Sequence, residues 1–352
     1  MKIVLAAGGT GGHIFPAMAV AQEIKMKNPD CELLWITTDR ANEKEIAQRF
    51  GIEMISLDVE GIARKISLQP VRAAAKLLKS AMFMNKFFKR NKIYAVVAFG
   101  GYVCAPVLFA AKSNKIPFFI QEQNTVAGAV NKFFAEGAKK IFLGMPLIKD
   151  FNADKSVVQI TGTPVRKIQN CDNFVFPASV DKKKKTILIC GGSQGAASMN
   201  KVLVEAVKWL SQNDFQIIWQ TGVAGEAEIK KCFDGNRNVI VFASIQDLYP
   251  YYSIARFLIG RAGASTISEA QLFALPSIFI PLPWSAENHQ WYNAQYAQNA
   301  GWALCFEQNE EVSGKIIDFA KNIEVYEKMK TRVSKNGKNA AETIAETVLN
   351  KN

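Results

Sequence analysis

His13 is one of two histidines in the chain, and the residues before it could place its imidazole beside a ligand. The stretch AAGGTGGHIFP, residues 6–16, follows the apolar run IVL and carries four glycines. A strand that enters a helix through a glycine turn gathers backbone N–H groups and the positive end of the helix dipole at one point, which favours a phosphate. An imidazole titrates at about pH 6.5, so His13 is a candidate general base. Glu122 is the alternative base, and a purely structural role for His13 stays open.

Two more glycine turns follow apolar runs, GGSQGA at 191–196 and RAGASTISEAQ at 261–271. In the second, three hydroxyl residues open a predicted helix, and Glu269 could accept both vicinal hydroxyls of a sugar or ribose. An ordinary capped helix explains the same pattern, because S/T-x-x-E is a capping box. Neither of the first two loops fits G-x-G-x-x-G or the nucleotide-triphosphate motif G-x-x-x-x-G-K-[ST]. Asp39, after the second predicted strand, keeps an NAD-dependent enzyme as a rival.

The elements that must position these loops alternate between apolar strands and helices. In the first half we expect a helix over 16–27 and strands at 2–8, 31–38, 93–100, 116–122 and 139–144. In the second half we expect strands at 186–192, 215–222, 238–244, 255–263 and 276–283. This alternation predicts an α/β protein with two doubly wound, Rossmann-like domains facing across a cleft, joined near TGTPVR at 161–166.

The composition suits such a protein. A chain of 352 residues that is 49% hydrophobic can build two buried cores. Its six cysteines form no C-x-x-C pair, which fits a reducing cytoplasm and predicts no metal site, and no export signal precedes the first strand. The run from Ile93 to Ala111 has no charge and is long enough to suggest a membrane span, but Gly100, Gly101 and Pro106 favour a buried strand, a turn and a helix.

The net charge of +12 is concentrated in one region, because no Asp or Glu occurs between residues 61 and 121. Basic and aromatic side chains recur there at helical spacing, and a basic amphipathic helix of this kind predicts binding to an anionic membrane surface: Arg72, Lys76, Lys79, Phe83, Lys86, Phe87 and Arg90. The alternative is a helix packed on the sheet with a solvated basic face. Nucleic acid is not an expected partner, because no recognised binding motif accompanies the charge.

Seven motifs occur in a fixed order along the chain: GGTGGHIFP, GGYVCAP, QEQNTVAG, GTPVR, GGSQGA, RAGASTISE and NHQWYNA. With them the sequence closely resembles the bacterial N-acetylglucosaminyltransferases of glycosyltransferase family 28, which convert lipid I to lipid II in peptidoglycan synthesis. The motifs run from Gly8 to Ala294, so the resemblance covers nearly the whole chain.

The resemblance implies a GT-B fold and an inverting transfer that needs no metal or other cofactor. The donor would be UDP-N-acetylglucosamine (UDP-GlcNAc) and the acceptor the C4 hydroxyl of the N-acetylmuramoyl sugar in undecaprenyl-diphospho-muramoyl pentapeptide. Residues 1–163 would form the acceptor and membrane-binding domain and 164–335 the donor domain, with a last helix at 336–352 packing back on the first. A different GT-B enzyme, with another nucleotide sugar or acceptor, is the runner-up. The absence of a D-x-D motif agrees with a metal-independent mechanism.

The family's substrate contacts carry over position by position. Donor contacts fall on Thr10, Gly11, Gly12, Asn124, Arg166 and Ser193, and Ile245 would touch the uracil. Diphosphate and ribose would be held by Ala264, Ser265, Thr266, Ile267, Ser268 and Glu269, and the sugar by Gln290. This sequence departs from the family at Gln121, where a histidine or similar residue is usual, and at Cys104-Ala105, where Ser-Gly is common. The resemblance also implies a peripheral position on the cytoplasmic face of the inner membrane and contacts with cell-wall synthesis and division proteins.

Overall fold

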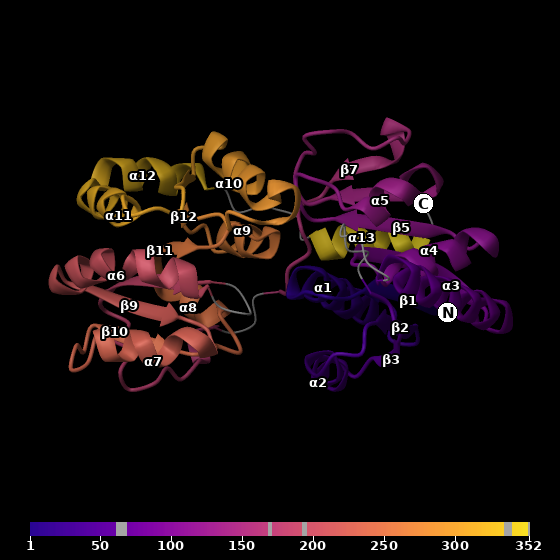
Figure 1. Cartoon of the computed structure of the whole chain (residues 1–352), viewed down its shortest axis with the longest axis horizontal. Helices are drawn as coiled ribbons and strands as arrows, with labels where there is room; N and C mark the ends of the chain where they lie inside the picture. Colours follow the sequence, from indigo (N-terminus) through magenta and orange to yellow (C-terminus); the bar gives the residue numbers. More distant parts are fainter. Residues whose placement is uncertain (61–68, 168–170, 192–195, 334–339, 351–352) are drawn as a thin grey trace. The chain divides into compact units, whose positions relative to one another are not determined.

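The computed structural model describes residues 1–60, 69–167, 171–191, 196–333 and 340–350 (Figure 1). The chain divides into two compact units: unit 1 comprises residues 1–167 and 338–352, and unit 2 comprises residues 168–337. The sequence-based boundaries were 163 and 335. Each unit is described below by itself.

Unit 1 contains a parallel sheet of seven strands in the order β3-β2-β1-β4-β5-β6-β7. The strands are β1 (Lys2–Ala7), β2 (Glu32–Thr37), β3 (Glu53–Ser56), β4 (Ile93–Gly100), β5 (Phe118–Glu122), β6 (Lys140–Leu143) and β7 (Val158–Ile160). The helices are α1 (Gly11–Lys27), α2 (Ala41–Phe50), α3 (Gln69–Arg90), α4 (Cys104–Ser113), α5 (Ala129–Phe134) and α13 (Ala340–Asn350). Successive side chains of a strand point to opposite sides of the sheet, so both faces are apolar here and both are covered by helices.

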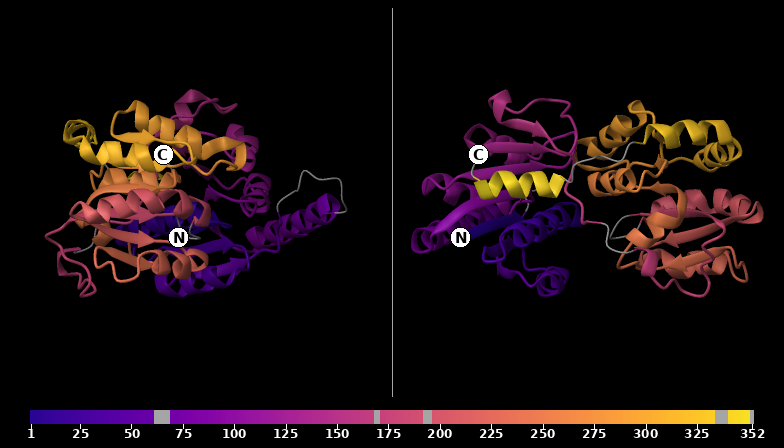
Figure 2. Two further views of the ribbon diagram at one scale, coloured as in Figure 1. Left: turned by 60° about the vertical axis from the view of Figure 1, so that its left-hand side comes forward. Right: turned by 180° about the vertical axis from the view of Figure 1, so that it is seen from behind.

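The two faces of this sheet have separate apolar cores. Ile3 and Leu5 of β1 pack in a cluster with α1 and α13, whereas Val4 and Ala6 pack in a second cluster with α3 and α4. The last helix, yellow in Figures 1 and 2, lies beside α1, and Ile344 and other side chains of α13 are buried in the first cluster. Unit 1 is therefore completed by the end of the chain.

Unit 2 contains a parallel sheet of six strands in the order β10-β9-β8-β11-β12-β13. The strands are β8 (Lys185–Cys190), β9 (Phe215–Gln220), β10 (Val239–Phe242), β11 (Ala255–Gly260), β12 (Ser277–Phe279) and β13 (Ala303–Cys305). The helices are α6 (Ala197–Gln212), α7 (Val223–Cys232), α8 (Tyr249–Ile254), α9 (Ala264–Leu272), α10 (His289–Asn299), α11 (Val312–Lys321) and α12 (Ile323–Arg332). Fully buried Trp219 lies in an apolar cluster that includes residues of α6 and α11.

Both sheets reverse their strand order once, between β1 and β4 in unit 1 and between β8 and β11 in unit 2. In doubly wound sheets ligands bind beyond the carboxyl ends of the strands at this reversal. The glycine turns after β1, β4 and β11 therefore lie at the edge where doubly wound sheets bind ligands, and most of the turn after β8 lies outside the described residues.

The Rossmann-like, doubly wound fold class is confirmed, and all ten strands expected from the sequence are present. Three strands were not expected, β3, β7 and β13. Residues 93–111 form β4 and most of α4, so the membrane-span alternative is wrong. No helix in the described part of the chain is long and apolar enough to cross a bilayer.

The first helix begins at Gly11, not at Pro16 as expected. Pro16 lies inside it, four residues after Gly12, whose carbonyl consequently lacks its usual helical N–H partner. The residues proposed to contact the donor, Gly11 and Gly12, are therefore the first two residues of a helix.

Candidate active site

The His13 imidazole is oriented by the glycine loop that precedes it. β1 ends at Ala7, Thr10 is the N-cap of α1, and His13 Nδ1 lies 3.0 Å from the carbonyl oxygen of Gly8. A carbonyl can only accept, so Nδ1 carries the proton in this bond and Nε2 carries the lone pair. The Thr10 hydroxyl also lies 3.5 Å from Nδ1. The loop therefore selects the tautomer whose Nε2 can accept a proton.

Gly100 and Gly101, at the end of β4, leave room for this arrangement. A Cβ on Gly100 would lie 2.7 Å from His13 Cδ2 and 2.8 Å from its Nε2, and one on Gly101 would lie 2.5 Å from the carbonyl oxygen of Gly8. Both glycines also have positive φ, +118° and +88°. Sequence reasoning treated them only as a turn and missed this role, although two glycines directly after a buried strand are the signal that could have shown it.

Glu122, the alternative base, is buried and already accepts four hydrogen bonds. Its Oε1 accepts the backbone N–H of Asn124 at 3.0 Å and the Asn124 side-chain amide at 3.3 Å. Its Oε2 accepts the N–H of Gly128 at 2.9 Å and the side-chain amide of Asn131 at 2.8 Å. A carboxylate held in this way orders the loop from 123 to 131 and orients Asn124.

Arg166 lies in the segment that follows β7. This segment is held to β6, because the N–H groups of Thr161 and Gly162 donate to the carbonyl of Leu143 at 2.9 and 3.2 Å. Arg166 follows four residues after Gly162 and is half-buried.

In unit 2 the turn after β11 is fixed by buried Arg261. Its guanidinium donates to the carbonyls of Ile280 and Pro281 at 3.0 and 3.1 Å, to the Ser198 hydroxyl at 3.1 Å and to the Gln308 amide oxygen at 2.6 Å. Burial lowers the pKa of Arg261 to about 10. Arg261 therefore ties the turn to the end of β12 and to α6.

The first turn of α9 follows directly, with Gly263 as its N-cap. The Ser265 hydroxyl is buried and has no partner within the described residues, and an unpaired buried hydroxyl at a helix N-terminus suits a phosphate oxygen. Ala264 is buried. Ile267 is also buried, and its N–H donates to the Gly263 carbonyl, so its side chain packs beneath the turn.

Other residues expected at the site surround this turn. Glu269 accepts a hydrogen bond from the Tyr252 hydroxyl at 3.2 Å, which orients its carboxylate. Half-exposed Thr266 and Ser268 lie in the first turns of α9, and Ile245 lies half-buried in the loop after β10. Gln290 Oε1 accepts the N–H of Leu282 at 3.0 Å, so the Gln290 amide is aligned by the loop that precedes α10. Ser193 lies outside the described residues.

The basic helix α3 presents an exposed stripe that we name the α3 patch. Its four basic residues share one side of the helix with Phe83, and two further apolar side chains lie next to them. The α3 patch comprises Arg72, Leu78, Lys79, Met82, Phe83, Lys86 and Arg90. Leu78, Met82 and Phe83 are 62%, 60% and 49% exposed. In the left view of Figure 2 the first turns of α3 project beyond the rest of unit 1.

Two residues expected in this surface have other roles. Lys76 forms ion pairs with Asp58, at 2.8 Å, and with Glu60, so its charge is compensated within unit 1. Phe87 is half-buried against the apolar core beside buried Phe88, because its position on the helix turns toward the sheet. Neither side chain is part of the α3 patch.

The described residues include no group of three or more His, Cys, Asp or Glu side chains arranged to hold a metal ion. At the two switch points, the groups that could stabilise a negative charge are backbone N–H groups at helix starts and hydroxyls.

Comparisons with known proteins place this geometry in context. The N-terminal domain of glycosyltransferase family 28 matches residues 3–143, and its C-terminal domain matches residues 186–348. A protein of Bacillus pumilus is 33% identical over 90% of this chain and 88% of its own length. One of Phocaeicola vulgatus is 35% identical over 95% and 92%. Both are named UDP-N-acetylglucosamine–N-acetylmuramyl-(pentapeptide) pyrophosphoryl-undecaprenol N-acetylglucosamine transferase. The crystal structure of Acinetobacter baumannii MurG is similar over 99% of this chain and 100% of that one, with a TM-score of 0.78 and 28% identity.

Proposed function

The chain belongs to glycosyltransferase family 28, and from that premise we propose the reaction that it catalyses. It is a hexosyltransferase that uses UDP-GlcNAc and acts on the N-acetylmuramyl-(pentapeptide) pyrophosphoryl-undecaprenol acceptor. GlcNAc passes to the C4 hydroxyl of the muramoyl sugar with inversion at the anomeric carbon, giving lipid II and UDP in peptidoglycan synthesis. The similarity to relatives that carry this name, over nearly the whole chain, is the observation that carries the proposal.

Each unit has one main task in this proposal. Unit 2 binds the donor nucleotide at its switch point, where the N-terminus of α9 and the Ser265 hydroxyl face the diphosphate and Glu269 accepts the ribose hydroxyls. Unit 1 binds the acceptor at the glycine loop before α1, whose backbone a diphosphate can approach closely. Asn124 and Arg166 of unit 1 contribute donor contacts, and Gln290 binds the donor sugar.

His13 is the proposed general base. Its Nε2 takes the proton of the attacking C4 hydroxyl as the new bond to the anomeric carbon forms and the bond to the UDP oxygen breaks. The negative charge that develops on the leaving diphosphate is stabilised by helix N-termini, hydroxyl donors and the Arg166 guanidinium. No step in this scheme uses a metal ion.

A transfer assay tests the reaction. Purified protein is incubated with labelled UDP-GlcNAc and lipid I, and lipid II and UDP are quantified with and without EDTA. We expect equimolar lipid II and UDP, much less transfer from UDP-glucose, and activity that persists in EDTA. Absence of transfer from UDP-GlcNAc, or loss of turnover in EDTA that only magnesium or manganese restores, would contradict the proposal.

We also propose that the α3 patch holds the protein at the cytoplasmic face of the inner membrane, where a lipid-linked acceptor resides. Exposed apolar side chains among exposed lysines and arginines combine shallow insertion with attraction to anionic lipid, and each cation near such a surface contributes about 1 kcal/mol. Contacts with division proteins are a further expectation.

Flotation with liposomes tests this second proposal. We expect binding to vesicles that contain anionic lipid, weakening as salt rises, and little binding to neutral vesicles. The double variant Lys79→Glu/Lys86→Glu should lose binding, whereas Lys201→Glu/Lys208→Glu on α6, which makes the same change in charge elsewhere, should retain it. Equal binding to neutral and anionic vesicles would exclude the electrostatic contribution to membrane binding.

A further inference from the structure

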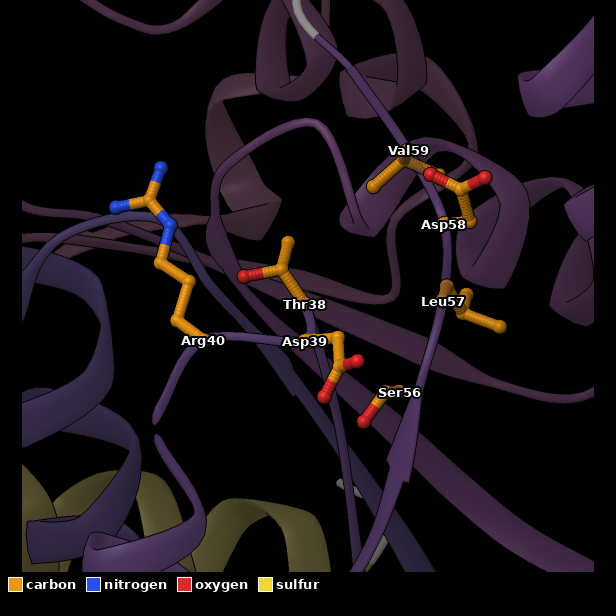
Figure 3. Close-up of a pocket in the computed structure, with 7 residues that line it drawn as sticks. All are labelled: Thr38, Asp39, Arg40, Ser56, Leu57, Asp58 and Val59. Atoms are coloured by element: carbon orange, nitrogen blue, oxygen red, sulfur yellow. The ribbon is translucent and has the colours of Figure 1, made fainter. Parts of the chain in front are cut away.

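Unit 1 contains a pocket that the proposed reaction does not use. It has a volume of about 400 Å³ and is lined by residues 38–40, which follow β2, and by residues 56–59, at and after the end of β3 (Figure 3). The volume falls in the range of ordinary small-ligand sites. The lining residues lie at or after the ends of β2 and β3, so the pocket is at the carboxyl edge of the sheet. β3 is an edge strand, so the pocket lies on the β2 side of the switch point.

The pocket shares a wall with the glycine loop. The Arg40 guanidinium donates to the carbonyl of Gly9, and the buried Glu43 carboxylate accepts the N–H of Gly9 at 3.3 Å. Glu43 also accepts the Thr38 hydroxyl at 2.8 Å and the N–H of Arg40 at 3.3 Å. The same side chains therefore hold both the loop that receives the acceptor and the nearer wall of the pocket, so a substituent of a ligand bound at the loop can extend into it.

The lining carries charges of both signs. In Figure 3 the Asp39 carboxylate and the Ser56 hydroxyl are drawn at the lower part of the pocket, the Asp58 carboxylate and Val59 at its upper right, and the Arg40 guanidinium at its upper left. Asp39 pairs with Lys44 at 2.9 Å and Asp58 with Lys76 at 2.8 Å. Two carboxylates beside one arginine disfavour a diphosphate, and a lining this polar disfavours a polyprenyl chain. Hydroxyls, carboxylates and a guanidinium suit a ligand with amide groups and a carboxylate.

We propose that this pocket binds the peptide arm of the acceptor, an inference that rests on the function proposed above. Of the acceptor's parts, the sugar and diphosphate belong at the glycine loop and the lipid belongs in the membrane, which leaves the peptide as the part with amide groups. The peptide is joined to the sugar through its amino end and ends in a free carboxylate. Arg40 binds a carboxylate of the peptide, while Asp39 and Ser56 bind its backbone N–H groups.

The test compares two acceptors in the same transfer assay. One is lipid I with its pentapeptide, and the other is the matched lipid in which the lactyl group ends in a simple amide. The variants are Asp39→Asn, which removes the carboxylate charge, and Ser56→Trp, which fills the pocket. The control is Asp150→Asn, because Asp150 is another exposed aspartate of unit 1 paired with a lysine, Lys155.

Wild-type enzyme should have a lower KM for the acceptor with the peptide. In Asp39→Asn and Ser56→Trp the KM for that acceptor should rise about three- to tenfold, the loss expected for one or two hydrogen bonds, so that the KM ratio of the two acceptors approaches one. The KM for UDP-GlcNAc should stay unchanged, and Asp150→Asn should behave as wild type.

The outcomes separate this inference from the function on which it rests. Equal KM values for the two acceptors in wild-type enzyme, or an equal change for both acceptors in the variants, would overturn the peptide pocket and leave the transferase intact. Absence of transfer to either acceptor would overturn the function. Binding of free muramoyl pentapeptide, measured by NMR, then tests the pocket alone. Saturable binding to the wild-type protein that Asp39→Asn weakens supports the pocket. Equal binding to both proteins, or no binding to either, overturns it.

Discussion

The imidazole of His13 is held by groups that also shape the glycine loop. Its Nδ1 lies 3.0 Å from the Gly8 carbonyl, and Gly100 has no side chain where one would meet the ring. A base fixed in one tautomer before substrate arrives loses little freedom in the transition state. These contacts leave Nε2 as the proton acceptor that the catalytic role requires.

The variant His13→Ala tests that assignment. We expect kcat to fall by about 10²- to 10⁴-fold because the acceptor hydroxyl loses its base, while the affinity for UDP-GlcNAc and the melting temperature change little. His289→Ala, which removes the chain's other histidine from a half-exposed position, is the matched control and should keep wild-type kcat. A His13→Ala enzyme with near-normal turnover would remove His13 from the role.

Glu122→Gln should act through the loop that Glu122 orders. The amide that replaces one carboxylate oxygen would face N–H donors, so we expect a loss of stability of about 2 kcal/mol or more and a raised KM for the donor through Asn124. Thermal unfolding and separate kcat and KM measurements, with exposed Glu136→Gln as control, check this. A lower kcat with unchanged stability and a lost acid limb in the pH profile would instead make Glu122 the base.

At the scale of elements, the strands that sequence reasoning missed share their position, because all three lie at the edges of the sheets. The ten expected strands include every central strand, whose continuous apolar runs are typical of parallel strands buried on both faces. β3, β7 and β13 are edge strands of three or four residues, EMIS, VQI and ALC, too short to show a periodicity. They form because a neighbouring strand offers hydrogen-bonding groups, which the local sequence does not reveal.

The same distinction applies to the candidate site. Glycine loops are visible in sequence because glycine is required by a turn, whereas Arg261 and Glu43 act through bonds to segments distant along the chain. The orientation of Phe87 toward the core also depended on which side of α3 meets the sheet. Contacts of this kind, between segments that are distant in the sequence, are what the sequence-based interpretation missed.

Two buried thiols at the carboxyl ends of the sheets predict how stability depends on pH. Burial raises the pKa of Cys104 and Cys190 from 9.0 to about 12. Because each thiol has a higher pKa in the folded than in the unfolded state, it stabilises the folded state fully at pH values below the unfolded pKa. This stabilisation is lost as pH rises from 9.0 to about 12. We therefore expect the free energy of unfolding to fall by about 1.4 kcal/mol per pH unit for each thiol in that window.

Urea unfolding at several pH values across that range measures the effect. The variant Cys104→Ala/Cys190→Ala should show a shallower alkaline decline than wild type, and Cys232→Ala, which removes an exposed thiol, should not. Rapid alkylation of Cys104 or Cys190 in the folded protein at about pH 8 would contradict the raised pKa, because the thiolate is the reactive form.

At the scale of the whole molecule, unit 1 is assembled from two separate parts of the sequence. Residues 1–167 supply its sheet and five of its helices, and the end of the chain supplies α13. Ala341, Ile344, Ala345 and Val348 are buried against the cluster that contains α1, and Lys27 pairs with Glu346 at 2.7 Å and Glu342 at 3.2 Å. The face of α1 behind the glycine loop thus depends on residues that are more than 300 positions away in the sequence.

This dependence predicts that residues 1–167 alone form an incomplete unit that a peptide can restore. We expect the fragment 1–167 to melt at a temperature that rises with the concentration of a peptide spanning residues 338–352, because the peptide binds only the folded fragment. The same peptide with Ile344→Asp should have no effect, since a carboxylate cannot be buried against the apolar face of α1. A fragment whose melting temperature ignores both peptides would show that α1 is stable without α13, and the final helix would then be dispensable for the loop that carries His13.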